Sequence, residues 1–224
     1  MLDAMPGSSV THLALWSLGA FLAGSVPFGL VLVKLAGKGD VRAHGSGNIG
    51  ATNVSRVGGK ALGIVTLLLD IAKGWLPVWL AAKLGVSFLG ISLVALAAVA
   101  GHIFTPWLKF KGGKGVATAL GAALGILPIA VLPSLGLFLL VLLTTRYVSL
   151  GSVLAAVLMP VSMVFFLGRQ PSSILLSGES YLMALAAWGL VFLLVIAKHH
   201  ENLRRLLNGT ESPLWGPKKE TPDA

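Results

Sequence analysis

Long apolar segments separated by short polar loops run through almost the whole chain, and they predict membrane-spanning helices. A helix needs about 20 residues to cross the hydrocarbon core of a bilayer. Seven segments are candidates, at residues 12–33, 61–82, 87–104, 116–128, 132–145, 148–167 and 181–197. The fourth and fifth are short, so we expect them to be tilted or partly re-entrant. The expected fold is an all-α integral membrane protein, a compact bundle of seven transmembrane helices.

Prolines and polar residues predict where these segments bend or end. Pro27 removes a backbone donor inside the first segment and predicts a bend there. In the nearly unbroken apolar block from 116 to 167, Pro128 and Pro133 predict one turn, and residues 146–149 predict another. Residues 1–11 have no positive stretch and no small-residue cleavage site, so no signal peptide is expected.

Composition supports the membrane assignment. Of the 224 residues, 55% are hydrophobic and 11% are charged, whereas roughly a quarter are charged in a soluble domain. We expect one membrane domain over residues 1–211 and a polar tail over 212–224. The net charge of +9 lies mostly beside apolar segments, which favours anionic lipid and anionic substrates over nucleic acid. Without cysteine there is no disulfide framework and no thiol nucleophile.

The distribution of basic residues predicts an orientation. With seven helices, the first, third and fifth loops lie on the same side as the C-terminus. That side holds most of the 17 basic residues: Lys34, Lys38, Arg42, Arg56, Lys60, Lys109, Lys111, Lys114, Arg146, Lys198, Arg204, Arg205, Lys218 and Lys219. By the positive-inside rule this side faces the cytoplasm and the N-terminus lies outside. The three most polar stretches of the chain, at 39–59, 101–118 and 198–211, then share the cytoplasmic face.

The first polar stretch is rich in glycine and in small polar side chains. A glycine-rich loop leaves backbone N–H groups open to an anion, and a nearby arginine suits a phosphate. The candidate phosphate-binding residues are Gly45, Ser46, Gly47, Asn48, Thr52, Asn53 and Arg56. The glycine spacing also matches the dinucleotide fingerprint, but no strand of a βαβ unit precedes it. The alternative is a flexible loop that binds nothing.

The second polar stretch places Gly112, Gly113 and Lys114 just before an apolar segment. The glycines allow close backbone approach, and Lys114 supplies a charge for a phosphate at a helix N-terminus. It is not a Walker A loop, because no Ser or Thr follows Lys114. The alternative for Lys114 is an interfacial lysine that extends to the lipid headgroups. His102 is expected to be a buried, hydrogen-bonded histidine.

The third polar stretch follows the last apolar segment. If that helix continues, His199, Asn202 and Leu206 share a face. His199 is then a candidate base or phosphate donor, with Asn202 as its orienting partner. The alternative is a basic helix that rests on lipid headgroups. His199 and His200 are adjacent and do not share a helical face, so no metal site is expected.

Two charged residues, Asp70 and Lys73, lie within the second apolar segment. Charges inside a membrane are costly and are usually paired. An ion pair within the helix is the favoured interpretation, and support for the glycine-rich loop is the alternative.

Taken together and in order, these stretches resemble a known family. The pattern is Gly-Ser-Gly-Asn-Ile-Gly-Ala-Thr-Asn-Val-x-Arg, then Gly-His-x-Phe…Phe-x-Gly-Gly-Lys-Gly-Val-Ala-Thr, then His-x-x-Asn-Leu-x-Arg-Leu-x-x-Gly-x-Glu. It is similar to the bacterial membrane acyl-phosphate:glycerol-3-phosphate acyltransferases, over nearly the whole chain. The sequence departs from that family at Thr105-Pro106, where proline is expected directly after the phenylalanine, and at Lys198, where arginine is common.

The resemblance implies transfer of a fatty acyl group from acyl phosphate to glycerol 3-phosphate, the first step of phospholipid synthesis, in the bacterial cytoplasmic (inner) membrane. Catalytic roles are implied for His199, Asn202 and Ser46, and phosphate binding for Arg56 and Lys114, with Ser149 as a weaker candidate. The base is either His199 or a substrate phosphate. No cofactor and no obligatory protein partner is implied.

Two rival functions remain to be weighed. A transporter or channel for a phosphorylated solute predicts polar residues along a path through the membrane, including the external side. The expected external loops carry little beyond Lys83, Arg169 and Glu179. An assembly or scaffold protein predicts no concentrated glycine-rich phosphate loops. Both fit the sequence poorly.

Overall fold

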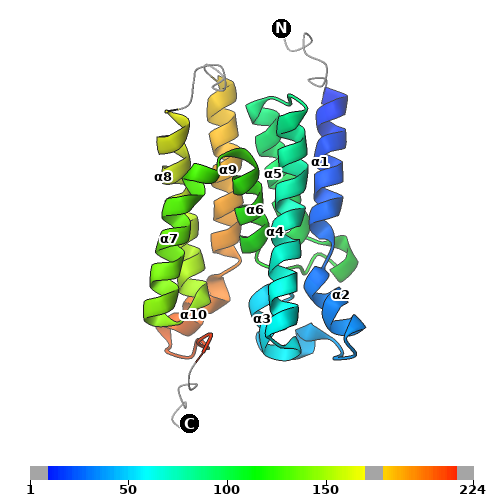
Figure 1. Cartoon of the computed structure of the whole chain (residues 1–224), viewed down its shortest axis with the longest axis vertical. Coiled ribbons are helices and arrows are strands. Elements are labelled where there is room, and N and C mark those ends of the chain that lie inside the picture. Colours follow the sequence, from blue (N-terminus) through cyan, green and yellow to red (C-terminus); the bar gives the residue numbers. More distant parts are fainter. Residues whose placement is uncertain (1–9, 170–178, 216–224) are drawn as a thin grey trace.

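All of the regular structure in the described residues, 10–169 and 179–215 of this computed structural model, is helical. The helices pack side by side as an elongated bundle (Figure 1). The α-helices are α1 (Val10–Ser25), α2 (Phe28–Leu35), α3 (Ala51–Gly58), α4 (Lys60–Lys83), α5 (Phe88–Ile103), α6 (Val116–Ile126), α7 (Pro128–Thr145), α8 (Val148–Leu167), α9 (Glu179–Ala197) and α10 (His200–Leu207). Two short 3-10 helices, η1 (Val41–Ala43) and η2 (Pro106–Leu108), lie in the loops.

Five helical segments among the described residues are long and apolar enough to cross a membrane. They are α1 with α2, α4, α5 with η2, α7 and α8, and the bent pair of α9 and α10 makes a sixth. Helix α6 has 11 residues, which at 1.5 Å per residue is about 17 Å and shorter than the hydrocarbon core. The expectation of an all-helical membrane protein is therefore confirmed, while seven crossings remain a prediction.

Helix α5 lies at the centre of the bundle, and small residues let its neighbours approach closely. Ala95, Ala98 and Val99 are completely buried. A Cβ added to Gly24 of α1 would lie 2.0 Å from the Ala98 carbonyl oxygen, so α1 contacts the α5 backbone directly. Close approach through glycine is how membrane helices gain packing energy when no hydrophobic force drives them together.

The short helix α6 is held against α4 in the same way. A Cβ on Gly74 would lie 2.0 Å from the Thr118 carbonyl oxygen, and one on Gly121 would lie 2.0 Å from the Ile71 carbonyl oxygen. Two reciprocal glycine contacts fix the position of α6 along α4. They also fix the loop that enters α6, which carries the second polar stretch.

The bend predicted at Pro27 is a complete break between α1 and α2. Side chains from the loop after α5 and from α4 satisfy the carbonyls that the break exposes. Thr105 Oγ1 donates to the Ser25 carbonyl at 2.7 Å, and Lys73 Nζ donates to the Val26 carbonyl at 2.8 Å. Trp107 Nε1 donates to Ser25 Oγ at 2.9 Å. The loop that contains Thr105 and Pro106, where the sequence departs from the family pattern, is thus hydrogen-bonded to the end of α1.

The expected ion pair between Asp70 and Lys73 is confirmed. Lys73 Nζ lies 2.8 Å from Asp70 Oδ1, and the two side chains are 3% and 4% exposed. Lys73 also lies over the Phe28 ring, 5.6 Å from its centroid. The pair supports the break between α1 and α2 rather than the glycine-rich loop. His102 is buried beside it, with Nδ1 3.7 Å from Asp70 Oδ1.

One predicted turn is placed differently. We expected Pro128 and Pro133 to mark the connection between two helices, but the break is at Leu127, and Pro133 lies inside α7. Pro128 begins the helix, where its missing N–H costs nothing. Pro133 removes a single donor, which a packed membrane helix tolerates. The turn predicted at residues 146–149 is confirmed, since α7 ends at Thr145 and α8 begins at Val148.

Candidate functional site

A cavity of about 220 Å³ lies where the loop before α3, the loop before α6 and helix α10 meet. Its lining carries four basic side chains and one carboxylate, so it is positive at neutral pH. A positive cavity of this kind suits a phosphate. The lining residues are Ser46, Gly47, Asn48, Lys111, Gly112, Gly113, Lys114, Lys198, His200, Glu201, Asn202 and Arg205.

The loop before α3 takes its shape from Asn53, which is 1% exposed. Asn53 Oδ1 accepts from the Ser46 backbone N–H at 2.9 Å. A Cβ on Gly45 would lie 2.2 Å from the same oxygen, and Gly45 has a φ of 62°, so only glycine fits this position. The Nδ2 group donates to the carbonyls of Val41, His44 and Asn48. Asn53 therefore organises the loop that presents Ser46.

The first polar stretch is only partly a loop. Helix α3 begins at Ala51, so Thr52, Asn53 and Arg56 are helical. Gly50 is the N-cap of this helix, and its backbone N–H donates to Asn48 Oδ1 at 2.8 Å. The loop therefore ends at Gly50, and the rest of the first polar stretch is part of α3.

The glycines of the second stretch are required because the loop folds back on the end of α5. The Gly112 and Gly113 N–H groups donate to the carbonyls of Ile103 and His102, both at 3.1 Å. A Cβ on Gly112 would lie 2.0 Å from the His102 carbonyl oxygen, and one on Gly113 would lie 2.1 Å from His102 Nε2. This loop therefore packs directly against the buried His102.

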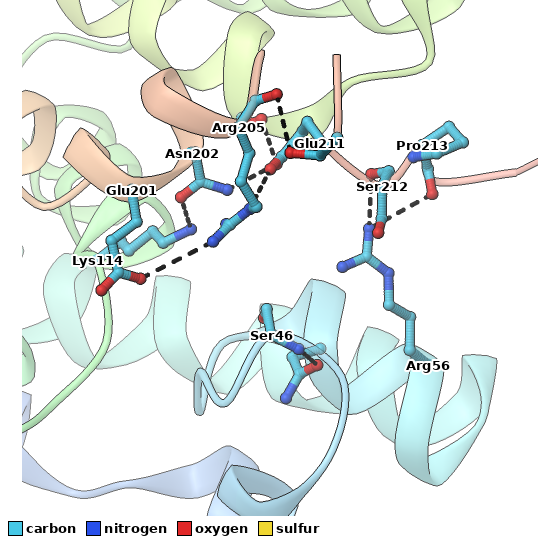
Figure 2. Close-up of polar contacts among 12 residues, drawn as sticks. Ser46, Arg56, Lys114, Glu201, Asn202, Arg205, Glu211, Ser212 and Pro213 are labelled. Atoms are coloured by element: carbon cyan, nitrogen blue, oxygen red, sulfur yellow. Dashed lines mark hydrogen bonds and ion pairs between the residues drawn. The ribbon is translucent and has the colours of Figure 1, made fainter. Parts of the chain in front are cut away.

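Lys114 reaches from this loop to α10, where its Nζ donates to Asn202 Oδ1 at 2.5 Å (Figure 2). Burial lowers the pKa of Lys114 to about 8. The charges of Glu211 and Glu201 oppose this shift, and those of Arg205 and Arg56 add to it. Its direct hydrogen-bond partner is a neutral amide, so the ammonium charge is not cancelled by contact.

The last apolar helix does not continue straight into the third polar stretch. Helix α9 ends at Ala197, α10 begins at His200, and the two axes differ by 48°. The His199 N–H bonds the Ile196 carbonyl three residues back, and its ring bonds the Val195 carbonyl. This tight turn ends α9. The condition under which His199, Asn202 and Leu206 would share a face, one continuous helix, is therefore not met.

His199 is 2% exposed, and it does not line the cavity. Its Nδ1 lies 2.7 Å from the Val195 carbonyl oxygen. That oxygen only accepts, so Nδ1 carries the proton of the neutral ring and Nε2 keeps a lone pair. Burial lowers the pKa of His199 to about 4, helped by the charge of Lys114 and opposed by the Val195 bond and Glu211. The imidazole is neutral at pH 7.

Glu211 is the main residue that we did not select from the sequence. Its Oε1 accepts from Ser149 Oγ at 2.7 Å and from Asn202 Nδ2 at 2.6 Å, and its Oε2 accepts from Arg205 Nε at 2.7 Å. Burial acts to raise the pKa of Glu211, but the three hydrogen bonds and the Arg205 charge outweigh it, so the pKa is lowered. Glu211 holds Asn202, Arg205 and the start of α8 together.

The structure divides the residues selected from the sequence into two groups. One group lines the cavity: Ser46, Gly47, Asn48, Gly112, Gly113, Lys114 and Asn202. The other group does not: Gly45, Thr52, Asn53, Arg56, Ser149 and His199. Among the latter, Ser149 is bonded to Glu211, and Arg56 donates to the Ser212 and Pro213 carbonyls.

Five cavity residues were missed: Lys111, Lys198, His200, Glu201 and Arg205. The sequence signal for them was the high density of charged residues around the second and third polar stretches. For the third stretch, which contains Arg205, the alternative interpretation was contact with lipid headgroups. Lys198 also lies over the Phe104 ring, 5.5 Å from its centroid. Among the described residues, no group of three or more His, Asp or Glu side chains is placed to hold a metal ion.

Several known proteins are similar to this chain over most of its length. Residues 14–209 match the model of the family described as glycerol-3-phosphate acyltransferase. A glycerol-3-phosphate acyltransferase of Geobacter sulfurreducens is 50% identical over 193 residues, which is 86% of this chain and 93% of the relative. One of Trichlorobacter lovleyi is 50% identical over 197 residues, 88% of this chain and 95% of the relative.

A solved structure shares the fold. The crystal structure of PlsY (YgiH), an integral membrane glycerol 3-phosphate acyltransferase, in its glycerol 3-phosphate form, matches with a TM-score of 0.78 and 37% identity, covering 91% of this chain and 96% of that one. A second crystal structure shows that protein in its lysophosphatidic acid form, with a TM-score of 0.77, 36% identity and coverage of 90% and 94%. By sequence and by fold, the chain belongs to the glycerol-3-phosphate acyltransferase family of integral membrane proteins.

Proposed function

We propose that this protein transfers a fatty acyl group from acyl phosphate to a hydroxyl of glycerol 3-phosphate. The products are 1-acylglycerol 3-phosphate and inorganic phosphate. The observation that carries the proposal is the positive cavity between the two glycine-rich loops and α10. A solved relative of the same fold, 37% identical, is described in a glycerol 3-phosphate form.

The choice of acyl phosphate as donor has separate support. Phosphate is a good leaving group, so no acyl-enzyme is needed, and the chain has no cysteine. It also lacks the His-x-x-x-x-Asp motif of the other large class of glycerolipid acyltransferases. The residues five positions after His102, His199 and His200 are Trp107, Arg204 and Arg205. A donor with a long acyl chain reaches a membrane-embedded site directly from the lipid.

The reaction is a direct displacement. The acceptor hydroxyl oxygen forms the ester bond to the acyl carbon while the bond from that carbon to the phosphate oxygen breaks. We assign Ser46 and Lys114, which line the cavity, to phosphate binding, and Asn202, which holds Lys114, to positioning. The cavity is assigned to the phosphate of glycerol 3-phosphate, and Arg56, which lies outside the cavity lining, is assigned to the phosphate of acyl phosphate. Ser149 donates its hydroxyl proton to Glu211, so it is not assigned to a phosphate. Charge that develops on the leaving phosphate is stabilised by these fixed donors.

The hydroxyl proton passes to a phosphate oxygen rather than to His199. The second pKa of a phosphate ester is about 6, which is closer to neutral pH than the pKa of about 4 of buried His199. A base is most effective when its pKa lies near the working pH. We therefore assign His199 to positioning of glycerol 3-phosphate.

We propose seven crossings, with the N-terminus outside and the cavity on the cytoplasmic face of the inner membrane. Helix α1 begins at one end of the bundle and α10 lies at the other (Figure 1), which an odd number of crossings requires. The cavity lies at the α10 end, where most basic residues gather. Positive loops favour the cytoplasmic side.

An assay of the purified full chain in detergent tests the proposal. Palmitoyl phosphate, palmitoyl-CoA and palmitoyl-carrier protein are each offered with labelled glycerol 3-phosphate. The expected result is lysophosphatidate from palmitoyl phosphate alone. Product from palmitoyl-CoA instead would overturn the donor assignment and keep the acyl transfer. No product from any donor, in folded protein, would overturn the function.

A further inference from the structure

After α10 the chain turns back across the end of the bundle. Gly209, with a φ of 69°, makes the turn, and the Glu211 N–H donates to the Arg205 carbonyl at 3.2 Å. The next three residues, Ser212–Leu214, form a segment that we call the strap. The Leu214 N–H donates to the Arg146 carbonyl at 2.8 Å, which fastens the strap to the turn between α7 and α8.

The strap contacts Arg56, which lies more than 150 residues earlier in the chain. Arg56 Nη2 donates to the Ser212 carbonyl at 3.1 Å and to the Pro213 carbonyl at 3.4 Å. Figure 2 shows Arg56 rising from α3 to these two carbonyls, with Ser46 on the neighbouring loop. These contacts use the backbone of the strap, so they depend on its path and not on its side chains.

The contact orients Arg56 without neutralising it. Both acceptors are uncharged carbonyls, and within the described part of the chain they are the hydrogen-bond partners of this guanidinium. An arginine has five N–H donors, and those on Nε and Nη1 are left for another ligand. The nearby carboxylate of Glu211 is bonded to Ser149, Asn202 and Arg205 instead.

The strap lies outside the part of the chain that the family shares most clearly. The family match covers residues 14–209, so it includes Arg56 and ends before the strap. We infer that the strap is a positioning element of this protein: the Ser212 and Pro213 carbonyls hold the Arg56 guanidinium so that its remaining N–H groups face a substrate phosphate. The identity of that phosphate rests on the proposed function.

Two full-length variants test the strap. Leu214→Pro removes the N–H that fastens it to Arg146, whereas Leu214→Ala keeps that N–H and changes only the side chain. We expect Leu214→Pro to raise the KM for acyl phosphate on the order of tenfold, as for a weakened hydrogen bond to a charged group. We expect kcat to change less, and Leu214→Ala to stay within about twofold of the unmodified protein. Equal KM values in the two variants would overturn the inference.

The same change in an Arg56→Lys background separates positioning from general damage. A lysine does not reproduce the fork of a guanidinium, so we expect Leu214→Pro to add little to the KM of that variant. An equal added rise in both backgrounds would mean that the strap acts on the structure as a whole. If Leu214→Pro does not fold, Pro213→Gly loosens the strap without removing a donor, and it should raise the KM in the same direction.

The outcome is readable even if the protein makes no product from acyl phosphate. Binding of inorganic phosphate is then measured by calorimetry on the same variants. Weaker phosphate binding in Leu214→Pro than in Leu214→Ala supports the strap although the proposed function has failed. Equal phosphate binding overturns it.

Discussion

Two lysines of this protein, Lys73 buried and Lys114 half-buried, have opposite surroundings. Lys73 in α4 is paired with Asp70 at 2.8 Å, donates to the Val26 carbonyl and lies over an aromatic ring. Lys114, before α6, donates to the neutral amide of Asn202 and lines an open cavity. Lys73 is shielded from water and Lys114 is partly shielded, and among the described residues only Lys73 has a carboxylate in contact.

The difference indicates which charge is available for a ligand. The ion pair at Lys73 stabilises the break between α1 and α2, and its charge is cancelled. The charge at Lys114 is oriented by Asn202, which Glu211 fixes in turn, and no carboxylate in the described part of the chain forms an ion pair with it. An anion that enters the cavity completes this site. Substitutions that remove one of these lysines, or that give Lys114 a carboxylate partner like that of Lys73, test this difference.

The largest effect is expected from Lys73→Met. It leaves Asp70 as a buried carboxylate without its partner, and breaking a buried pair from one side costs about 3–5 kcal/mol of stability. Thermal unfolding in detergent should show a much lower midpoint. Replacing both residues, as Asp70→Leu with Lys73→Met, should recover most of the loss. A Lys73→Met variant as stable as the unmodified protein would mean that the pair does not support the break.

A change at Asn202 should make Lys114 resemble Lys73. Asn202→Asp places a carboxylate against Nζ, which raises the lysine pKa and cancels its charge. We expect the KM for glycerol 3-phosphate to rise by at least about tenfold, the value of one lost charge-assisted contact. Steady-state kinetics beside Asn202→Ala, which adds no charge, measures this. The comparison breaks down if the two variants have the same KM.

The smallest effect is a pH dependence. The pKa of Lys114 is lowered to about 8, so the free enzyme loses this charge as the pH rises through 8. The ratio kcat/KM reports the free enzyme and should fall above about pH 8. Lys114→Arg stays charged throughout and should lack this decline. The same fall in both proteins would assign it to another group.

The same titration has a defined effect on stability. The folded-state pKa of Lys114 lies below that of the unfolded chain, which is about 10.4. Between about pH 8 and 10.4 the unfolded chain binds more protons, so the contribution of this group to the free energy of unfolding increases with pH. Thermal midpoints of the unmodified protein and of Lys114→Arg should therefore diverge over this interval.

The sequence was sufficient to predict what depends on composition and short motifs. The apolar segments, the bend at Pro27 and the Asp70–Lys73 pair could be predicted, while the functional roles of Lys114 and Asn202 remain predictions. The position of Lys114 opposite Asn202 could not, because it depends on how closely α6 packs on α4 through Gly74 and Gly121. That packing is a contact between backbones, which no periodicity records.

The remaining differences have local causes. The apolar pattern of α9 ends at Ala197 as the sequence predicts, but the change of direction before α10 could not be predicted, since it depends on the bond of the His199 ring to Val195. Asn53 is a polar residue of the type that binds phosphate, yet the hydrogen bonds of its side chain are made to the backbone of the loop. Glu211 is a single carboxylate in a polar tail, and its role emerges only when α8 and α10 meet.

The central claim is that the cavity at Lys114 binds the phosphate of glycerol 3-phosphate. Calorimetry on the full chain in detergent tests it directly, with glycerol as the uncharged control ligand. The matched variants are Lys114→Met and Lys109→Met, since Lys109 lies on the same loop and does not line the cavity. The account predicts that Lys114→Met loses about 1.5–3 kcal/mol of binding free energy, the value of a hydrogen bond to a charged group, while Lys109→Met binds normally. Equal binding of glycerol 3-phosphate by both variants would contradict it.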